Sequence, residues 1–186
     1  HATIRRQRQM CIRDRIIPSG HSSNDYVVER LECLSHDGRK VPLTITRHKK
    51  TKIDGNANVL LYGYGSYGSS MSPSFSSTRL SLINRDIIWV TAHIRGGLER
   101  GMKWWKEGKL LNKKNTFKDY LAVAKFLIEK KYTSKGKIVG MGGSAGGLLM
   151  GVAVNESPEL FCAVVMAVPF AVSYTHLTLP TNGCGE

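Results

Sequence analysis

The segment 137–151 reads KIVGMGGSAGGLLMG, and it constrains the fold more than any other part of the chain. Five glycines lie within residues 140–147, and they surround a single serine, Ser144. A short apolar run precedes this cluster, and an apolar run typical of a helix follows it. Three explanations compete: the glycines bind a phosphate group, they let two elements pack closely, or they hold Ser144 in a strained and exposed conformation.

The N-terminal half of the chain predicts a hairpin. Apolar and polar residues alternate on both sides of Asp37-Gly38, a dipeptide that strongly favours a tight turn. On the second arm, one face carries Val41, Leu43 and Ile45. This pattern predicts two antiparallel strands with one buried face.

The rest of the chain alternates between buried strands and helices. Compact apolar runs predict strands at 59–62, 86–93, 137–141 and 161–168. Apolar residues at helical spacing predict helices within 75–85, 116–128 and 147–155. Thr116 and Asp119 have the spacing of a capping box, which would begin the second of these helices.

This order of elements predicts an α/β fold: a mostly parallel sheet with helices on both faces and an N-terminal antiparallel hairpin. Continuously apolar strands are typical of a sheet that is covered on both sides. In such folds the functional site lies beyond the carboxyl ends of the strands. Ser144, directly after the strand at 137–141, lies at this edge.

The phosphate explanation has partial support. Gly140-x-Gly142-x-x-Ala145 matches the dinucleotide-binding fingerprint between a strand and a helix. The acidic residue that should bind the ribose is missing, because the next strand ends in Pro169-Phe170, and no phosphate-binding lysine follows the glycines. Close packing alone would explain one or two glycines. A dinucleotide-binding protein or a catalytically silent domain remains the alternative from another class.

The third explanation uses every residue of the cluster. Gly142-Gly143-Ser144-Ala145-Gly146 has the form G-x-S-x-G, the nucleophile elbow of α/β-hydrolases. The elbow glycines remove side chains that would clash at the sharp turn, so that the hydroxyl of Ser144 projects as a nucleophile. The amide of Ala145, at the start of the next helix, would donate to an oxyanion.

Longer stretches carry a resemblance to a family. They read LLYGYGSYGSSMSPSFSSTRLSLINR, AHIRGGLERGMKWWKEGKLLNKKNTFKDY, YTS, GGSAGGLLMG and NESPELFCAVVMAVPF, and they cover nearly all of residues 26–170. In these stretches the chain resembles the catalytic domain of the prolyl oligopeptidase family of serine peptidases, closest to its oligopeptidase B branch. The resemblance implies an α/β-hydrolase domain that works beside a β-propeller admitting only short peptides, with no cofactor and no metal.

The resemblance also assigns roles to residues. It implies that Ser144 is the nucleophile, that Ala145 gives one oxyanion-hole N–H, and that Tyr64 gives the second donor through its phenol. A tyrosine on a glycine-rich loop after a buried strand is well placed for this role, because the site opens there. The alternative for Tyr64 is an aromatic residue that only packs.

The acid and base of the triad are expected outside this chain. In α/β-hydrolases they follow the serine, the acid first and then the histidine. His176 is the only histidine after Ser144, and it lies in an unpatterned tail. Glu156 and Glu159 lie near the end of the elbow helix, on the wrong side for the task. His93 precedes the serine and is interpreted as structural, so the domain is expected to be truncated at its C-terminal side and inactive alone.

Substrate preference follows only from the resemblance, which implies cleavage after Lys or Arg. Some members have acidic residues where this chain has the neutral Ser72 and Ser74, and the family's RGGGE reads RGGLE here, with Glu99 retained. A proline-directed or aminopeptidase relative, or an esterase on the same fold, therefore stays open.

The two ends of the chain differ in pattern from its centre. Residues 1–17 and 171–186 have no strand or helix period and are expected to be non-native or disordered, which leaves a partial catalytic domain at 18–170.

The net charge is +13, but the basic residues are scattered, which argues against nucleic acid as a partner. Four distant cysteines and the lack of a leader or membrane span favour a cytoplasmic protein. The cysteines are Cys11, Cys33, Cys162 and Cys184. The expected partners are short peptides, a propeller and the remainder of the catalytic domain.

Overall fold

The computed structural model describes residues 22–71 and 74–170 of the 186-residue chain. The predicted terminal arms, 1–17 and 171–186, lie outside the described residues, and so do Ser72 and His176.

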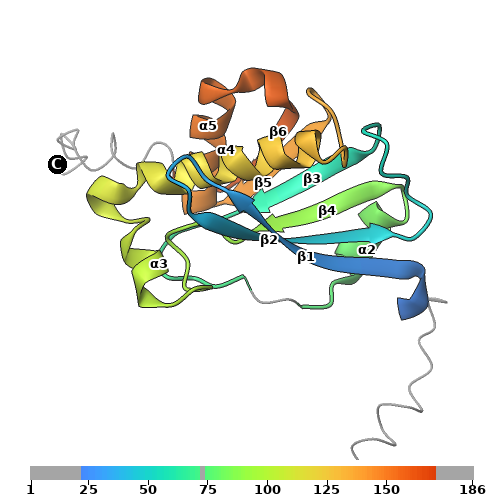
Figure 1. Ribbon diagram of the computed structural model, residues 1–186, viewed down its shortest axis with the longest axis horizontal. Helices are drawn as coiled ribbons and strands as arrows, with labels where there is room; N and C mark the ends of the chain where they lie inside the picture. The colour runs from blue at the N-terminus through green and yellow to red at the C-terminus, as the bar shows by residue number, and fades with distance from the viewer. Residues whose placement is uncertain (1–21, 72–73, 171–186) are drawn as a thin grey trace, which may run out of the picture.

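Within these residues, the strands form one six-stranded mixed sheet in the order β1-β2-β4-β3-β5-β6 (Figure 1). The strands are β1 (Tyr26–Leu34), β2 (Lys40–His48), β3 (Asn58–Gly63), β4 (Ile87–Ala92), β5 (Ile138–Gly143) and β6 (Phe161–Ala167). The β1–β2 and β2–β4 pairs are antiparallel, and the three remaining pairs are parallel. The parallel half places the carboxyl ends of β3, β5 and β6 side by side.

Helices cover both faces of the sheet. They are α2 (Ser77–Ile83), α3 (Met102–Lys106), α4 (Lys114–Glu129) and α5 (Ala145–Glu156), with 3-10 turns η1 (Ser23–Asp25), η2 (Leu110–Asn112) and η3 (Pro158–Leu160). Helices α4 and α5 lie together on one face, and α2 lies on the other (Figure 1). The predicted arrangement of layers is confirmed, although α3 was not predicted.

The hairpin forms as its sequence predicts. Gly38 has φ 75°, in the left-handed region that a tight turn requires and glycine adopts freely. The register pairs Leu31 with Leu43, and the predicted inner face of β2 is completely buried. The hairpin thus extends the parallel half of the sheet with two antiparallel strands.

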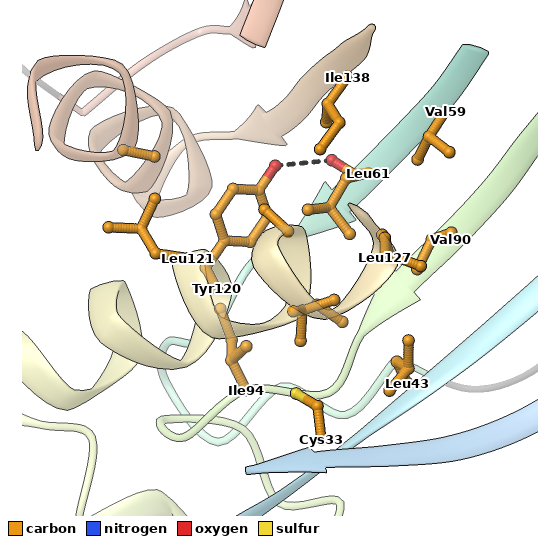
Figure 2. Close-up of a cluster of buried hydrophobic side chains, with 14 of the residues drawn as sticks. Cys33, Leu43, Val59, Leu61, Val90, Ile94, Tyr120, Leu121, Leu127 and Ile138 are labelled. Carbon is orange, nitrogen blue, oxygen red and sulfur yellow. Dashed lines mark hydrogen bonds between the residues drawn. The ribbon is translucent and has the colours of Figure 1, made fainter. Parts of the chain in front are cut away.

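The core between α4 and the sheet determines how β3 ends. The buried phenol of Tyr120 in α4 donates a hydrogen bond of 2.8 Å to the carbonyl oxygen of Leu61 in β3 (Figure 2). A Cβ atom added to Gly63 would lie 2.7 Å from Cδ2 of Tyr120, so only glycine fits at this point. The packing of Tyr120 therefore fixes the end of β3, directly before Tyr64.

Two details of the helices differ from the sequence-based expectations. The capping box is wrong: α4 begins at Lys114, Thr116 donates to the carbonyl oxygens of Arg95 and Gly108, and Asp119 accepts hydrogen bonds from Arg95. These side chains serve contacts between distant segments, which override the local pattern. Helix α5 begins at Ala145, earlier than predicted, because the last two glycines of the cluster, Gly146 and Gly147, already have helical conformation.

Candidate active site

Ser144 occupies the single residue between β5 and α5, and its backbone is strained. Its φ is 52° and its ψ is −116°, a conformation that L-residues rarely adopt and that costs about 1–3 kcal/mol. The residue is exposed, and its side chain makes no capping hydrogen bond to the helix. This is the geometry expected of a nucleophile elbow, with the hydroxyl held out of the local hydrogen bonding.

The glycines around Ser144 are needed to different degrees. A Cβ atom at Gly142 would overlap the carbonyl of Gly146, and one at Gly146 would lie 2.8 Å from the carbonyl oxygen of Gly63. At Gly143 an added Cβ would meet only ordinary contacts, the nearest at 3.5 Å. Two of the three predicted elbow glycines are therefore required by close approach of backbone, and Gly143 is not.

The last residue of β6 and the residues directly after it contact the elbow. The amide of Ser144 donates to the carbonyl oxygen of Ala167 at 2.8 Å, and the amide of Phe170 donates to the carbonyl oxygen of Ser144 at 3.0 Å. A Cβ atom at Gly147 would lie 2.6 Å from Cβ of Pro169. Sequence reasoning missed this role of Ala167, Pro169 and Phe170, because backbone bonds between distant segments leave no side-chain signal.

Tyr64 lies beside the elbow. It follows β3 by one residue, and β3 pairs in parallel with β5 in the register Tyr62 to Met141. A Cβ atom at Gly146, in the first turn of α5, would lie 3.4 Å from Cδ2 of Tyr64 and 3.5 Å from its Cα. The structure therefore brings Tyr64 to the start of α5, the helix that Ser144 directly precedes.

The electrostatics favour Tyr64 and Ala145 as hydrogen-bond donors. Partial burial, with smaller contributions from Tyr67 and Tyr62, raises the pKa of the Tyr64 phenol above its usual value. The phenol thus stays protonated well above neutral pH. Ala145 is the first residue of α5, so its N–H has no acceptor within the helix and lies at the positive end of the helix dipole.

The candidates for a general base among the described residues lie elsewhere. His93 is buried, its Nε2 lies 2.8 Å from Oγ1 of Thr44 in β2, and its Nδ1 lies 3.7 Å from Oε1 of Glu99. Strands β4 and β3 separate β2 from β5, so these contacts support a structural role for His93. Glu156 ends α5, roughly 18 Å along the helix from Ser144 at 1.5 Å per residue.

A groove of about 710 Å³ lies on the opposite face of the sheet, between α2 and the strands. Its lining includes Val28, Thr46, Leu80, Trp89 and His93, and it includes neither Ser144 nor Tyr64. The groove is therefore separate from the elbow.

A buried ionic cluster supports the loop after β4. Arg95 is 1% exposed and bonds to Asp119, which is completely buried, and to Asp37 in the hairpin turn. Ser35 also donates to Asp119, at 2.5 Å. Sequence reasoning missed this cluster because an arginine in a basic chain looks like surface. The available signal was an acidic residue, Asp119, on the apolar side of a helix.

The described residues give no sign of a metal site or a membrane segment. They contain no group of three or more His, Cys, Asp or Glu side chains that could hold a metal ion. In residues 22–71 and 74–170, no helix has the length and apolar character needed to cross a membrane.

A strained serine between an inner parallel strand and a helix, with helices on both faces of the sheet, defines the α/β-hydrolase fold. Comparison with known proteins agrees with this fold class and identifies the family within it. Residues 73–181 match the model of the prolyl oligopeptidase family. The chain belongs to this family of peptidases, which favours the nucleophile explanation of the glycine cluster over the dinucleotide explanation.

The relatives are much longer than this chain. It is 44% identical over 163 residues to dipeptidyl aminopeptidase BI of Pseudoxanthomonas mexicana, covering 87% of this chain and 22% of that protein. It is 43% identical over 162 residues to protease 2 of Moraxella lacunata, covering 87% and 24%. The structure of oligopeptidase B from Leishmania major matches with a TM-score of 0.83 and 41% identity, covering 88% of this chain and 23% of that one. The chain thus spans about a quarter or less of the length of these relatives.

Proposed function

We propose that this chain carries the nucleophile of a serine oligopeptidase, and that Ser144 forms an acyl-enzyme with short peptides. The observation that carries the proposal is the strained, exposed Ser144 at the start of α5, with Tyr64 against the first turn of the same helix. Family membership supplies the class of reaction.

The proposed chemistry proceeds in two halves. Oγ of Ser144 attacks the scissile carbonyl carbon while its proton passes to a general base, and the base then protonates the amine as the C–N bond breaks. Water attacks the resulting ester in the same way and releases the peptide acid. The phenol of Tyr64 and the amide of Ala145 would donate to the oxyanion in both halves.

The general base and its orienting acid are proposed to lie outside the described residues. The described histidines are His36, His48 and His93, and none of them belongs to β3, to β5 or to the loops that follow these strands. The longer relatives have the chain length to supply both groups, together with the propeller that the resemblance implies.

Cleavage after Lys or Arg is the proposed preference, in keeping with the similarity to oligopeptidase B. Ser74 is exposed and neutral, so the carboxylates that would bind a basic side chain must come from other segments. The names of other relatives, among them the prolyl endopeptidase of Dictyostelium discoideum, make cleavage after proline the preference to test against.

The test compares the 186-residue chain with a protein extended by the C-terminal catalytic segment of a close relative. Both are treated with a fluorophosphonate, and the labelled peptide is identified by mass spectrometry. We expect Ser144 to be labelled in the extended protein, Ser144→Ala to remove the label, and Ser77→Ala, an exposed serine on α2, to leave it unchanged. Label on another residue would contradict the proposal.

Peptide turnover then tests the preference. Fluorogenic dipeptides with Arg, Lys, Pro or Ala before the cleaved bond separate the possible specificities. The extended protein is expected to favour Arg and Lys, and the 186-residue chain alone is expected to be slower by about ten-thousand-fold, because a serine without its base is a poor nucleophile. Ordinary turnover by the chain alone, abolished by Ser144→Ala, would show that a base lies within it.

A further inference from the structure

Lys113, the residue directly before α4, has an unusual environment for a lysine. Its Nζ donates to the carbonyl oxygen of Gly65 at 2.6 Å and to Oγ of Ser66 at 2.7 Å. The side chain is half-buried, and no described carboxylate lies within 4 Å of it. A lysine on the surface would keep its ammonium in water. The ammonium of Lys113 instead binds two neutral oxygens, and it thereby attaches the start of α4 to the loop at Gly65 and Ser66.

The attachment points are the two residues that follow Tyr64. Gly65 has φ 65°, and a Cβ atom there would lie 2.7 Å from Cγ1 of Ile94 and 2.9 Å from the carbonyl oxygen of Arg95. Three residues after Gly65, the amide of Gly68 donates to the carbonyl oxygen of Gly96 at 2.9 Å. The loop therefore packs on residues 94–96 along one side and is held by the ammonium of Lys113 along the other.

We infer that Lys113 is a positioning residue: its ammonium fixes the Gly65–Ser66 peptide and thereby orients the phenol of Tyr64 toward the oxyanion at Ser144. This inference rests on the proposed function. Lys113 acts through the backbone and does not touch the substrate. It also explains why an unpaired cation is retained at a half-buried position, where burial without a carboxylate is unfavourable.

Burial lowers the pKa of Lys113 to about 8. The titratable groups on the packed segments are Tyr64 and Tyr67 on the loop, and Arg95 and Asp119 below it. Arg95 is paired with Asp119 and also with Asp37 in the buried cluster. The ammonium is thus charged at neutral pH and is lost as the pH rises through about 8, which weakens both of its hydrogen bonds.

The first experiment needs no activity. The 186-residue chain is labelled with tyrosine that carries ¹³C in its ring, whose phenol titrates above this pH range, and the Tyr64 ring resonances are assigned by Tyr64→Phe and followed by NMR from pH 6.5 to 9.5. We expect a step near pH 8 that disappears in Lys113→Met and Lys113→Arg and persists in Lys114→Met, the exposed neighbour. Absence of the step in the wild-type chain, or its survival in Lys113→Met, would overturn the inference.

The second experiment measures acylation in the extended protein. Tyr64→Phe should slow fluorophosphonate labelling by about a hundredfold, since removal of one oxyanion donor costs on the order of 10²–10³. Lys113→Met should slow it about tenfold, Lys113→Arg should largely restore it, and Lys113→Met should add nothing when Tyr64→Phe is already present. Full additivity of the two substitutions would show that Lys113 does not act through Tyr64. If Ser144 is not labelled at all, the proposed function fails, while the NMR result still decides the inference.

Discussion

Arg95 and Asp119 form a buried forked ion pair: Nε of Arg95 lies 2.8 Å from Oδ2 of Asp119, and a terminal nitrogen of the guanidinium lies 2.6 Å from Oδ1. The backbone amide of Arg95 also donates to Oδ2, at 3.1 Å. Arg95 follows β4 and Asp119 lies in α4, so the pair joins the loop beside Tyr64 to the helix that Lys113 precedes. Two charges so deeply buried are tolerated only because their hydrogen bonds are satisfied.

Removing one partner should therefore be costly. Asp119→Ala leaves the guanidinium of Arg95 without its main counter-charge, and we expect the free energy of unfolding to fall by about 3–5 kcal/mol. Glu129→Ala, at the exposed end of the same helix, should change it by less than about 0.5 kcal/mol. Urea unfolding followed by circular dichroism measures both. Equal stabilities of the two variants would show that the pair does not stabilise the fold.

The third member of the cluster gives a pH dependence. Burial acts to raise the pKa of Asp37, but hydrogen bonds from Arg95 and from the amide of Arg39 outweigh it and lower the pKa below the usual value. The stabilisation from Asp37 is therefore fully present above its unfolded pKa of about 4, and it is lost as the pH falls through the lower folded value. The side chain is 34% exposed, which limits the contribution to about 1 kcal/mol.

Asp37→Asn tests this dependence. The difference in unfolding free energy between the wild-type chain and the variant should be constant from pH 5 to pH 7 and shrink toward zero below about pH 3. Glu129→Gln controls for the loss of one negative charge. A difference that stays constant down to pH 2 would contradict the assigned interaction.

Local patterns predicted most of this fold because the hairpin and the parallel strands follow simple periods. Asp37-Gly38 and the alternation over Val41, Leu43 and Ile45 are sufficient for the hairpin, and the glycine cluster locates the elbow. The role of Tyr64 as an oxyanion donor was assigned from the family resemblance, and its position after a buried strand is compatible with that role. These features are encoded by neighbouring residues, so a single sequence shows them.

The parts that were missed depend on distant segments. Thr116 and Asp119 matched a local cap, yet contacts to Arg95 use both side chains. The bonds of Ala167 and Phe170 to Ser144 involve only backbone atoms, which any residue could supply. Lys113 is followed by a second lysine, Lys114, and for such a pair surface exposure is the ordinary expectation. None of these contacts has a period or spacing that could be recognised without the fold.

Gly146 and Gly151 lie in the same helix, α5, but substitution by alanine should change the free energy of unfolding in opposite directions at the two positions. A Cβ atom at Gly146 would lie 2.8 Å from the carbonyl oxygen of Gly63, so Gly146→Ala should lower the free energy of unfolding by about 1–3 kcal/mol and displace Tyr64. A Cβ atom at Gly151 would have no atom within 4 Å other than those of its own helix backbone, so Gly151→Ala should raise the free energy of unfolding by about 0.5–1 kcal/mol through helix propensity. Urea unfolding measures the stability changes, and the Tyr64 ring spectrum reports the displacement. Destabilisation by Gly151→Ala would show that there is no room for a methyl group at this position.

The strain at Ser144 predicts a conflict between stability and reactivity. With φ 52° and ψ −116°, the residue has a conformation that glycine adopts at no steric cost. Ser144→Gly should therefore raise the free energy of unfolding by about 1 kcal/mol, after allowance for the greater freedom of glycine in the unfolded chain, and should abolish fluorophosphonate labelling in the extended protein. Ser144→Ala removes the same hydroxyl but keeps the Cβ atom, so its stability should stay within about 0.5 kcal/mol of the wild-type value. Thermal and urea unfolding of the three proteins measure the difference. If Ser144→Gly were no more stable than Ser144→Ala, the backbone at the elbow would be relaxed, and the glycines around it would need an explanation other than strain.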